Sequence, residues 1–338
     1  MIENQNVLVT GGAGSVGRSL VPPLLARDPN VIRLFDNNEG GLVQADHEFN
    51  DERLRYLLGN IRERPRLARA MEDIDVVIHT AGIKHVDISE YNPFEAVKTN
   101  VLGLQNVVET ATEAGVDRVV FTSSDKAVTP ANTMGTSKLL GEKLTTAGNK
   151  YRGSSDLRLT SVRFGNVINS SRSVVPVFEE QIRNGGPVTL TDERMTRFFL
   201  TYGDVADLIT TAIEETGGGE VFVRKMPAVR IEDLAETMID TLAEKYGHRP
   251  EDIDIELIGR RVGETLHEEI MTEREVERTV ENDEYYAIQP ETTEKNRFLE
   301  YDGLPDFSPA EGIVRSSERA EKIDREEIEQ MVLDSVGD

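Results

Sequence analysis

Short apolar runs alternate with longer amphipathic segments along the first two thirds of the chain. Runs rich in Val, Ile and Leu at 7–10, 31–36, 76–82 and 118–124 have the length and composition of buried strands. Residues 99–116 between two of these runs carry apolar side chains at helical spacing. Because strands that alternate with helices form parallel sheets, the pattern predicts an α/β protein with a doubly wound parallel sheet.

A glycine-rich turn, TGGAGSVG (10–17), follows the first predicted strand. Glycines allow a pyrophosphate to approach the backbone, and the free N–H groups of a helix start bind it. Asp36 ends the second strand about twenty residues further on, where a carboxylate accepts hydrogen bonds from an adenosine ribose. This combination predicts a Rossmann-type dinucleotide site; the alternative is a glycine turn in an unrelated α/β protein. The turn residues expected at the cofactor are Gly11, Gly14, Ser15, Val16 and Gly17.

The residues after Asp36 favour one nicotinamide cofactor over another. Asn37, Asn38 and Glu39 provide no cation for the 2′-phosphate of NADP, and the Asp36 carboxylate repels it. NAD is therefore the expected cofactor, with NADP as the alternative if a basic residue reaches the ribose from elsewhere in the fold.

Composition narrows the class of protein. Hydrophobic content of 38% and charged content of 30% are typical of a soluble globular protein, and the absence of cysteine excludes disulfides and thiolate metal sites. The apolar runs are too short to cross a bilayer, and the sequence shows no signal peptide. We therefore expect a cytoplasmic protein without a membrane partner.

The charge balance bears on partners and environment. A net charge of -24 with no compensating basic patch argues against nucleic acid as a partner. Acidic residues are spread along the whole chain, and only 10 of the 38 basic residues are lysine, which favours a protein solvated at high salt over an acidic mesophile protein. The five histidines lack metal-ligand spacing, so no metal site is predicted.

Six motifs in order give the chain a family likeness: TGGAGSVG (10–17), HTAGIKHVDISEYNPFEAVKTNVLG (79–103), SSDKAVTPANTMGTSK (123–138), VRFGNVINS (162–170), DERMTRFFLT (192–201) and GRRVGETLHEEI (259–270). The sequence resembles the extended short-chain dehydrogenases/reductases. Within them it is similar to the polysaccharide-biosynthesis group of inverting UDP-N-acetylglucosamine 4,6-dehydratases, over nearly the whole chain. In one subgroup a methionine replaces the usual tyrosine four residues before a lysine, as Met134 does here before Lys138.

The resemblance implies roles for a short catalytic segment. Lys126 corresponds to the base at C5 of the sugar, Asp125 to the acid at the 6-hydroxyl, and Ser124 to a hydrogen-bond donor at the C4 oxygen. Lys138 holds the nicotinamide ribose, while Met134 shapes the pocket. The group that takes the C4 hydroxyl proton stays open between Lys126 acting twice and a water. The alternative for Asp125 and Lys126 is a surface ion pair in a loop.

The same resemblance implies further binding residues. Asn166 and Arg197 correspond to diphosphate ligands, Arg261 to a second cation and Glu264 to the acceptor for the uridine ribose; the alternative for the arginines is ordinary surface charge.

A lone histidine such as His85 is more often structural than catalytic. The remaining expected cofactor residues are Asn60, where an aspartate is common, Ile61, Ala81, Gly82, Lys84 and Asn100, and the remaining expected substrate residues are Lys84, His85, Met134, Ser173 and Val174.

The chain is expected to have interleaved domains. We assign residues 1–165 to the Rossmann domain, with 203–223 returning to it, 166–300 to a smaller nucleotide-sugar domain, and 301–338 to an acidic helical segment. An amphipathic stripe at 325–334 is expected to dock on its own domain.

Helices at 99–115 and 136–147 form a subunit interface in the family, so a homo-oligomer, dimer or hexamer, is expected. Three functions compete: the dehydratase, a UDP-sugar 4-epimerase, and a non-catalytic nucleotide-binding regulator. An epimerase needs no base at C5 and depends on the tyrosine that is missing here, whereas a regulator predicts a damaged glycine turn or a missing Lys138.

Overall fold

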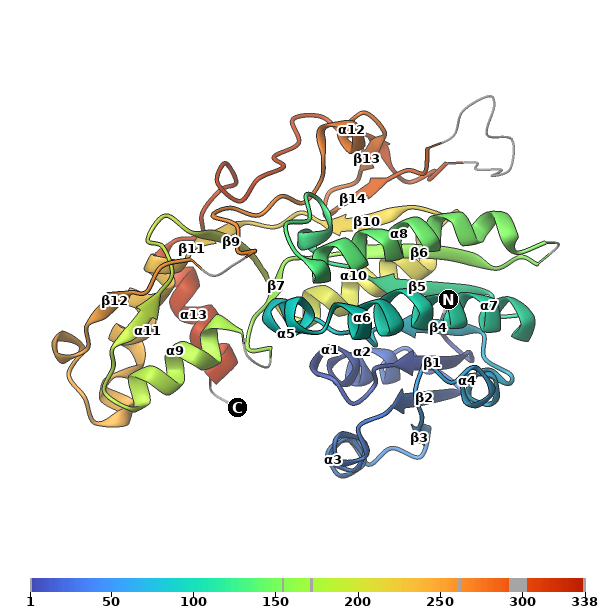
Figure 1. The fold of residues 1–338 in the computed structure, drawn as a ribbon, viewed down its shortest axis with the longest axis horizontal. Helices are drawn as coiled ribbons and strands as arrows, with labels where there is room; N and C mark the ends of the chain where they lie inside the picture. The colour runs from blue at the N-terminus through green and yellow to red at the C-terminus, as the bar shows by residue number, and fades with distance from the viewer. Residues whose placement is uncertain (1, 154, 171–172, 261–262, 292–302, 337–338) are drawn as a thin grey trace. The chain divides into compact units, whose positions relative to one another are not determined.

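The structure is a computed structural model that describes residues 2–153, 155–170, 173–260, 263–291 and 303–336. The chain divides into two compact units (Figure 1). The large unit comprises Met1–Phe164, Tyr202–Lys225 and Met271–Ile313, and the small unit comprises Gly165–Thr201, Met226–Ile270 and Val314–Asp338.

A ten-stranded sheet forms the centre of the large unit, in the order β15-β13-β14-β10-β6-β5-β4-β1-β2-β3. The strands from β3 to β10 are parallel, and β1 lies between β2 and β4, where the direction of winding reverses. Ligands of such sheets bind beyond the carboxyl ends of the strands at this switch point. The strands are β1 Asn6–Thr10, β2 Val31–Asp36, β3 Leu54–Leu58, β4 Val76–His79, β5 Arg118–Thr122, β6 Arg158–Arg163, β10 Val221–Arg224, β13 Thr279–Glu281, β14 Tyr285–Ile288 and β15 Ser308–Pro309.

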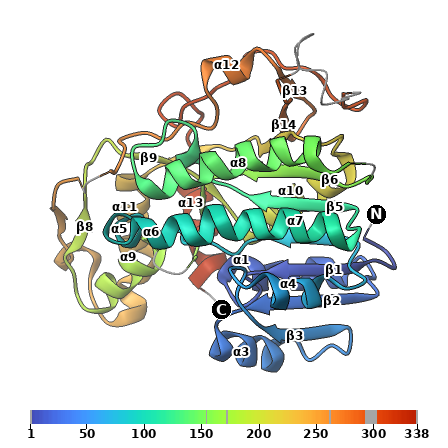
Figure 2. The same cartoon turned by 45° about the vertical axis from the view of Figure 1, so that its right-hand side comes forward.

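Helices cover this sheet. Figure 2 shows α4, α7 and α8 side by side in front of the strands, while α10 packs with α1 and against β5, β6 and β10. All four residues of β4 are buried, as expected for a strand covered on both faces. The helical segments are α1 Ser15–Ser19, α2 Val21–Leu25, α3 Glu39–Phe49, α4 Arg64–Met71, α5 Val86–Tyr91, α6 Pro93–Ala96, the π-helix η1 Val97–Gly103, α7 Leu104–Ala114, the 3-10 turn η2 Asp125–Ala127, α8 Thr133–Tyr151, α10 Tyr202–Glu215 and α12 Glu273–Val276.

The small unit is built from helices around short strands. Its core includes Phe178 of α9, Leu234 of α11 and Val332 of α13. β7, β9 and β11 form one sheet, and β8 pairs with β12. The elements are β7 Asn166–Val167, α9 Val174–Arg183, β8 Val188–Leu190, β9 Thr196–Leu200, β11 Ala228–Arg230, α11 Ile231–Leu242, the 3-10 turns η3 Glu244–Tyr246 and η4 Pro250–Asp252, β12 Ile255–Leu257 and α13 Arg325–Val336.

The C-terminal third departs from the expected division. Residues 271–300 were placed with the substrate domain, but β14 pairs antiparallel with β10 and β13 pairs with β14, which puts these strands in the large unit. The four residues of β14 are buried, so an extra strand covers the otherwise open edge of β10. Residues 301–338 do not form a separate segment either, because β15 joins the large sheet and α13 packs on α11.

Two features of the helices bear on the remaining expectations. The stripe at 325–334 does dock within its own unit, since Ile328 and Val332 are buried in the core that α11 also lines. In the described part of the chain, no helix combines the length and the apolar character needed to span a membrane.

Candidate active site

The glycine turn after β1 is tightly folded. Gly11 has a φ of +75°, and a Cβ there would lie 2.6 Å from the Ala81 nitrogen. A Cβ on Gly17 would lie 2.2 Å from the Gly11 oxygen, so the first turn of α1 packs directly on the loop. A Cβ on Gly14 would meet only the Gly11 oxygen, at 3.2 Å, among the described atoms. The turn therefore requires glycine sterically at 11 and 17, and Gly14, Ser15 and Val16 follow at the start of α1.

Asp36 ties the end of β2 to this turn. Its Oδ2 accepts a hydrogen bond from the Ala13 N–H at 3.0 Å, and its Oδ1 accepts one from the Asn38 N–H at 2.9 Å. The carboxylate thus lies beside the glycine loop at the edge of the sheet. This is the position at which a dinucleotide fold presents an acceptor to a ribose.

The loops after β3 and β4 follow the same edge. The Asn60 Oδ1 accepts from the Arg62 N–H at 3.0 Å, and Ile61 is buried. Asn100 of η1 accepts from the Ile83 N–H at 2.8 Å and donates to the Ile83 carbonyl at 3.0 Å. Its amide also donates to the Ser137 hydroxyl at 2.9 Å. Asn100 therefore links the loop that contains Ala81, Gly82 and Ile83 to α8 by hydrogen bonds.

Lys138 and Met134 occupy the same buried face of α8, one turn apart. The Lys138 Nζ donates to the Thr122 carbonyl at 2.8 Å and lies 4.9 Å from the centre of the Phe121 ring. Burial lowers the pKa of Lys138 to about 8, and the nearby Glu142 carboxylate acts against that shift. A Cβ on Gly82 would lie 3.4 Å from the Nζ, so the amine lies beside the loop that follows the carboxyl end of β4.

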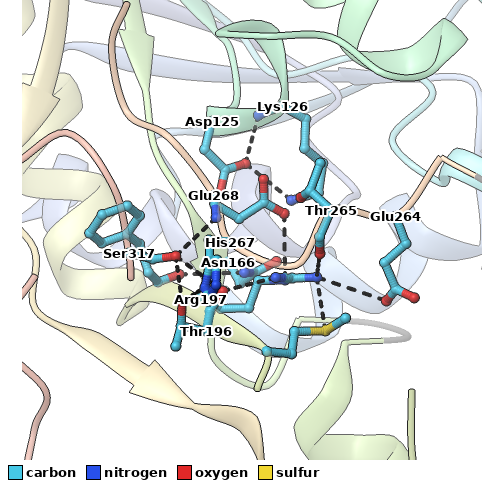
Figure 3. A network of polar contacts seen from close by, with 12 residues as sticks. Asp125, Lys126, Asn166, Thr196, Arg197, Glu264, Thr265, His267, Glu268 and Ser317 are labelled. Atoms are coloured by element: carbon cyan, nitrogen blue, oxygen red, sulfur yellow. Dashed lines mark hydrogen bonds and ion pairs between the residues drawn. The ribbon is translucent and has the colours of Figure 1, made fainter. Parts of the chain in front are cut away.

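Ser124, Asp125 and Lys126 form one hydrogen-bonded group after β5, and Figure 3 shows the contact between Asp125 and Lys126. The Asp125 Oδ1 accepts from the Ser124 hydroxyl at 2.9 Å, the Lys126 N–H at 2.8 Å and the Lys126 Nζ at 3.1 Å. Asp125 is 2% exposed, and its Oδ2 has no hydrogen-bond partner in the described part of the chain. The pair is thus not a surface ion pair, because one of its two members is buried.

Lys84 and His85 follow this sheet edge at the start of α5. Burial lowers the pKa of Lys84. His85 is the residue before the first turn of α5, and its carbonyl accepts from the Ser89 N–H at 3.0 Å and the Ser89 hydroxyl at 2.8 Å.

Arg197, on β9 of the small unit, is held from several sides (Figure 3). Its Nε lies 3.4 Å from the Glu268 carboxylate, and its Nη2 lies 3.9 Å from the Glu264 carboxylate. The side chain is only 9% exposed, so the guanidinium is not an ordinary surface charge. Its other acceptors are the carbonyls of Thr196 at 2.8 Å, Thr265 at 2.9 Å and Leu266 at 3.1 Å, and the Met195 sulfur at 3.0 Å.

The other expected substrate residues of the small unit are dispersed over its first elements. The Asn166 Nδ2 donates to the Phe198 carbonyl at 3.4 Å. Ser173 precedes α9, which begins at Val174, and its buried hydroxyl has no hydrogen-bond partner within the described ranges. Arg261 lies outside the described residues.

The contacts of Ser317 and Arg163 are not among the sequence predictions. Ser317 donates or accepts at the Thr196 hydroxyl (2.8 Å) and accepts from the Glu268 N–H at 2.9 Å. Thr196 lies 121 positions away, so no local pattern reveals the contact. Arg163, in contrast, sits inside a recognised motif, and an arginine in a buried strand signals a buried carboxylate partner.

A metal centre is not evident: among the described residues, no three His, Cys, Asp or Glu side chains are grouped so that they could hold an ion.

Sequence comparisons match this chain to known proteins over most of its length. Residues 7–290 match the family of polysaccharide biosynthesis proteins. An uncharacterized membrane protein of Methanocaldococcus jannaschii is 46% identical over 87% of this chain and 89% of its own. The UDP-N-acetylglucosamine 4,6-dehydratase (inverting) of Campylobacter jejuni is 39% identical over 86% of this chain and 84% of its own. The UDP-glucose 4-epimerase of Rickettsia rickettsii is 35% identical over 85% of this chain and 84% of its own.

Solved structures agree with the fold. Pen from Bacillus thuringiensis matches with a TM-score of 0.89 and 38% identity, over 98% of both chains. The dTDP-glucose 4,6-dehydratase DesIV of Streptomyces venezuelae, with NAD and TYD bound, matches with a TM-score of 0.68 and 25% identity, over 77% of this chain and 86% of its own.

These matches confirm the mostly parallel Rossmann-type sheet and the resemblance to extended short-chain dehydrogenases/reductases and inverting UDP-N-acetylglucosamine 4,6-dehydratases. The chain therefore belongs to the polysaccharide biosynthesis protein family.

Proposed function

We propose that this protein is a nucleotide-sugar 4,6-dehydratase that acts on UDP-N-acetylglucosamine or a close relative, with inversion at C5, in polysaccharide or glycan biosynthesis. The observation that carries the proposal is the buried Asp125 carboxylate, which has one oxygen bonded to Lys126 and the other without a partner among the described residues. Incubation with UDP-N-acetylglucosamine tests it, because elimination lowers the product mass by one water and epimerisation leaves it unchanged.

The residues at the sheet edge fit a nicotinamide dinucleotide. The glycine turn leads into the start of α1, Asp36 offers a ribose acceptor, and Lys138 places a buried amine near Gly82. Lys138 would hold the nicotinamide ribose by hydrogen bonds, and the cofactor would supply hydride-transfer chemistry between C4 and C6 of the sugar.

Asp125 and Lys126 divide the proton chemistry between them. The C5 hydrogen becomes acidic only once C4 is a ketone, and Lys126 then removes that proton while Asp125 protonates the departing 6-hydroxyl. These roles require a neutral amine and a protonated carboxyl. The hydrogen bond from the Lys126 Nζ to the Asp125 Oδ1 provides a path by which one proton moves from the lysine to the aspartate and prepares both groups. Protonation of C5 from the opposite face inverts that centre.

The small unit supplies the expected groups for the UDP moiety. A guanidinium grips phosphate oxygens in two places, and Arg197 is already oriented by its carbonyl and carboxylate contacts. We infer that Arg197 and Asn166 bind the diphosphate, that Glu264 accepts from the uridine ribose, and that Arg261 is a second cation.

A UDP-sugar 4-epimerase is the second candidate, favoured by the relative of that name at 35% identity. The pairing of Lys126 with the buried Asp125 and the presence of Met134 favour the dehydratase, since an epimerase needs no base at C5 and needs a phenol at the position of Met134. The intact glycine turn and Lys138 argue against a non-catalytic regulator.

A homo-oligomer is also proposed. Near the start of η1 and on α8, large apolar side chains are exposed in a chain of high net charge, and such surfaces mark interaction sites. Tyr91 is 88% exposed and Phe94 is 79% exposed, and Val97 and Leu140 line a hollow of about 440 Å³.

We expect the protein to bind NAD more tightly than NADP. The Asp36 carboxylate lies beside the glycine turn, where it would repel a 2′-phosphate. Calorimetric titration of the two cofactors at high salt is the measurement. Tighter binding of NADP would show that a cation from elsewhere reaches the ribose.

Met134→Leu is expected to keep most of the dehydratase activity. The side chain is buried, a swap of similar volume costs less than about 1.5 kcal/mol, and a thioether moves no proton. Initial rates of water loss, measured with the folded and cofactor-loaded variant, provide the test. Complete loss of activity would assign the thioether a chemical role.

A further inference from the structure

A buried ion network joins β6, α8 and α12 of the large unit. Arg163, at the end of β6, is 0% exposed. Its Nε and Nη2 donate to the two oxygens of Glu142 at 3.0 and 2.7 Å. Its Nη1 and Nη2 donate to the two oxygens of Glu275 at 3.2 and 2.9 Å. The Arg163 guanidinium therefore donates hydrogen bonds to two carboxylates, those of Glu142 and Glu275, both of which are nearly buried.

The network joins elements that are far apart in the sequence. Glu142 lies on α8, while Glu275 lies on α12, 112 positions from Arg163. Glu275 also accepts from the Thr272 N–H at 2.8 Å in a capping box. Burial raises the pKa of Glu275, but Arg163 and then Thr272 outweigh burial and lower it to about 2. A buried ion pair is often no more stabilising than apolar packing, so stability alone does not account for this network.

The position of Glu142 relative to Lys138 indicates a further role. The two residues lie one turn apart on the buried face of α8, a spacing at which a glutamate and a lysine ordinarily pair. Here both Glu142 oxygens accept from Arg163, and the Lys138 Nζ donates to the Thr122 carbonyl instead. The Glu142 carboxylate is thus bound by Arg163 one helical turn from Lys138, while the amine stays hydrogen-bonded to the Thr122 carbonyl.

We propose that Glu142, fixed by Arg163 and with Glu275 completing the network, is a positioning residue that keeps Lys138 charged and directed at the nicotinamide ribose. The inference deepens the proposed function and rests on the role of Lys138 stated there. Glu142 itself touches neither cofactor nor substrate in this scheme.

The charges around Lys138 give the direction of the effect. Burial lowers the Lys138 pKa to about 8, and Glu142 is the group that opposes this. His79 is buried with its own pKa lowered to about 3, first by burial and then by Lys138, so it carries no charge at neutral pH. Two elements that pack against α8 carry further charged residues. Asp125 and Lys126 lie on η2, and Arg163 lies on β6. Removal of the Glu142 charge therefore lowers the Lys138 pKa further, and the ammonium loses its proton at a lower pH.

The test is a direct titration of Lys138 in the cofactor-free protein. With ¹³Cε-labelled lysine, the Lys138 signal is assigned by its loss in Lys138→Arg. Glu142→Gln is expected to move the titration midpoint down by about one pH unit, a tenfold loss in proton affinity. The substitution keeps an acceptor oxygen for Arg163, and Arg163 keeps Glu275, so the fold is expected to persist. Glu142→Asp keeps the charge and is expected to leave the midpoint above that of Glu142→Gln.

Glu220→Gln is the matched control. Glu220 is a fully buried carboxylate of the same unit that binds the Thr216 hydroxyl at 2.7 Å and the Gly217 N–H at 2.8 Å. Its substitution is expected to lower thermal stability without moving the Lys138 midpoint. A lower melting temperature of Glu142→Gln with an unmoved midpoint would overturn the inference, since Glu142 would then be merely structural.

A second arm separates this inference from the proposed function. NAD binding is titrated against pH, and the pH at which affinity is halved is expected to fall in Glu142→Gln along with the Lys138 midpoint. If the midpoint moves and NAD binding does not, the coupling between Glu142 and Lys138 holds, and the ribose role of Lys138 is overturned instead.

Discussion

Lys126→Ala is expected to abolish the loss of water from UDP-N-acetylglucosamine while UDP-sugar binding stays within a few-fold of the original protein. A positioned general base contributes about 10²- to 10⁴-fold to a rate, so at least a 10²-fold loss is expected. The Asp125 carboxylate keeps the Ser124 hydroxyl and the backbone N–H of residue 126 as donors, so the loop is expected to hold its shape.

Asp125→Asn is the companion variant, because its amide oxygen can still accept hydrogen bonds but the side chain cannot protonate the 6-hydroxyl. Both variants are assayed by product mass at saturating NAD, with UDP affinity measured separately. A matched control is Lys98→Ala, which removes a lysine that pairs with Glu95 at the surface. Elimination by Lys126→Ala at nearly the original rate would refute the assignment of the base.

Arg197→Ala is expected to show the opposite pattern, with UDP binding weakened by about 10²-fold or more and the chemistry of bound substrate less affected. Truncation removes the expected diphosphate ligand, and a guanidinium contact with phosphate oxygens is among the stronger charge-assisted hydrogen bonds. It also removes the ion pairs of Arg197 with Glu268 and Glu264. Calorimetric titration with UDP measures the loss, and NAD affinity is expected to be unchanged.

Two variants make this result specific. Arg197→Lys keeps a charge but not the two-pronged geometry, and we expect intermediate affinity. Arg194→Ala removes an exposed arginine of the same segment that pairs with Asp192, and we expect no change. Unchanged UDP binding in a folded Arg197→Ala protein would show that the diphosphate binds elsewhere.

Buried parallel strands were the part of the fold most open to prediction. β4 and most of β1 and β5 are fully buried, so their sequences are unbroken apolar runs that need no partner information to recognise. β13 and β15 are only three and two residues long, and their pairing depends on β14 and β10. Such short strands have no periodicity, so sequence alone does not reveal that β13 and β14 join the sheet of the large unit.

The candidate site divides in the same way. Asp125, Lys126 and Lys138 lie within one motif, so this short stretch of sequence was enough to propose them as site residues. Ser317 and Glu275 reach their partners across 121 and 112 positions, and only the folded chain reveals those contacts. Asn100 was expected at the cofactor, but its hydrogen bonds to Ile83 and Ser137 show that it also fixes the loop that would hold it.

The most direct test of the proposed activity is incubation of the purified protein with UDP-N-acetylglucosamine and NAD in D₂O, at high salt, with products followed by mass spectrometry and proton NMR. We expect a product that has lost one water and carries deuterium at C5, because the proton added to the opposite face of C5 is not the one that Lys126 removed and comes from solvent. A product of unchanged sugar composition, epimerised at C4 and without deuterium at C5, would contradict the dehydratase and identify an epimerase.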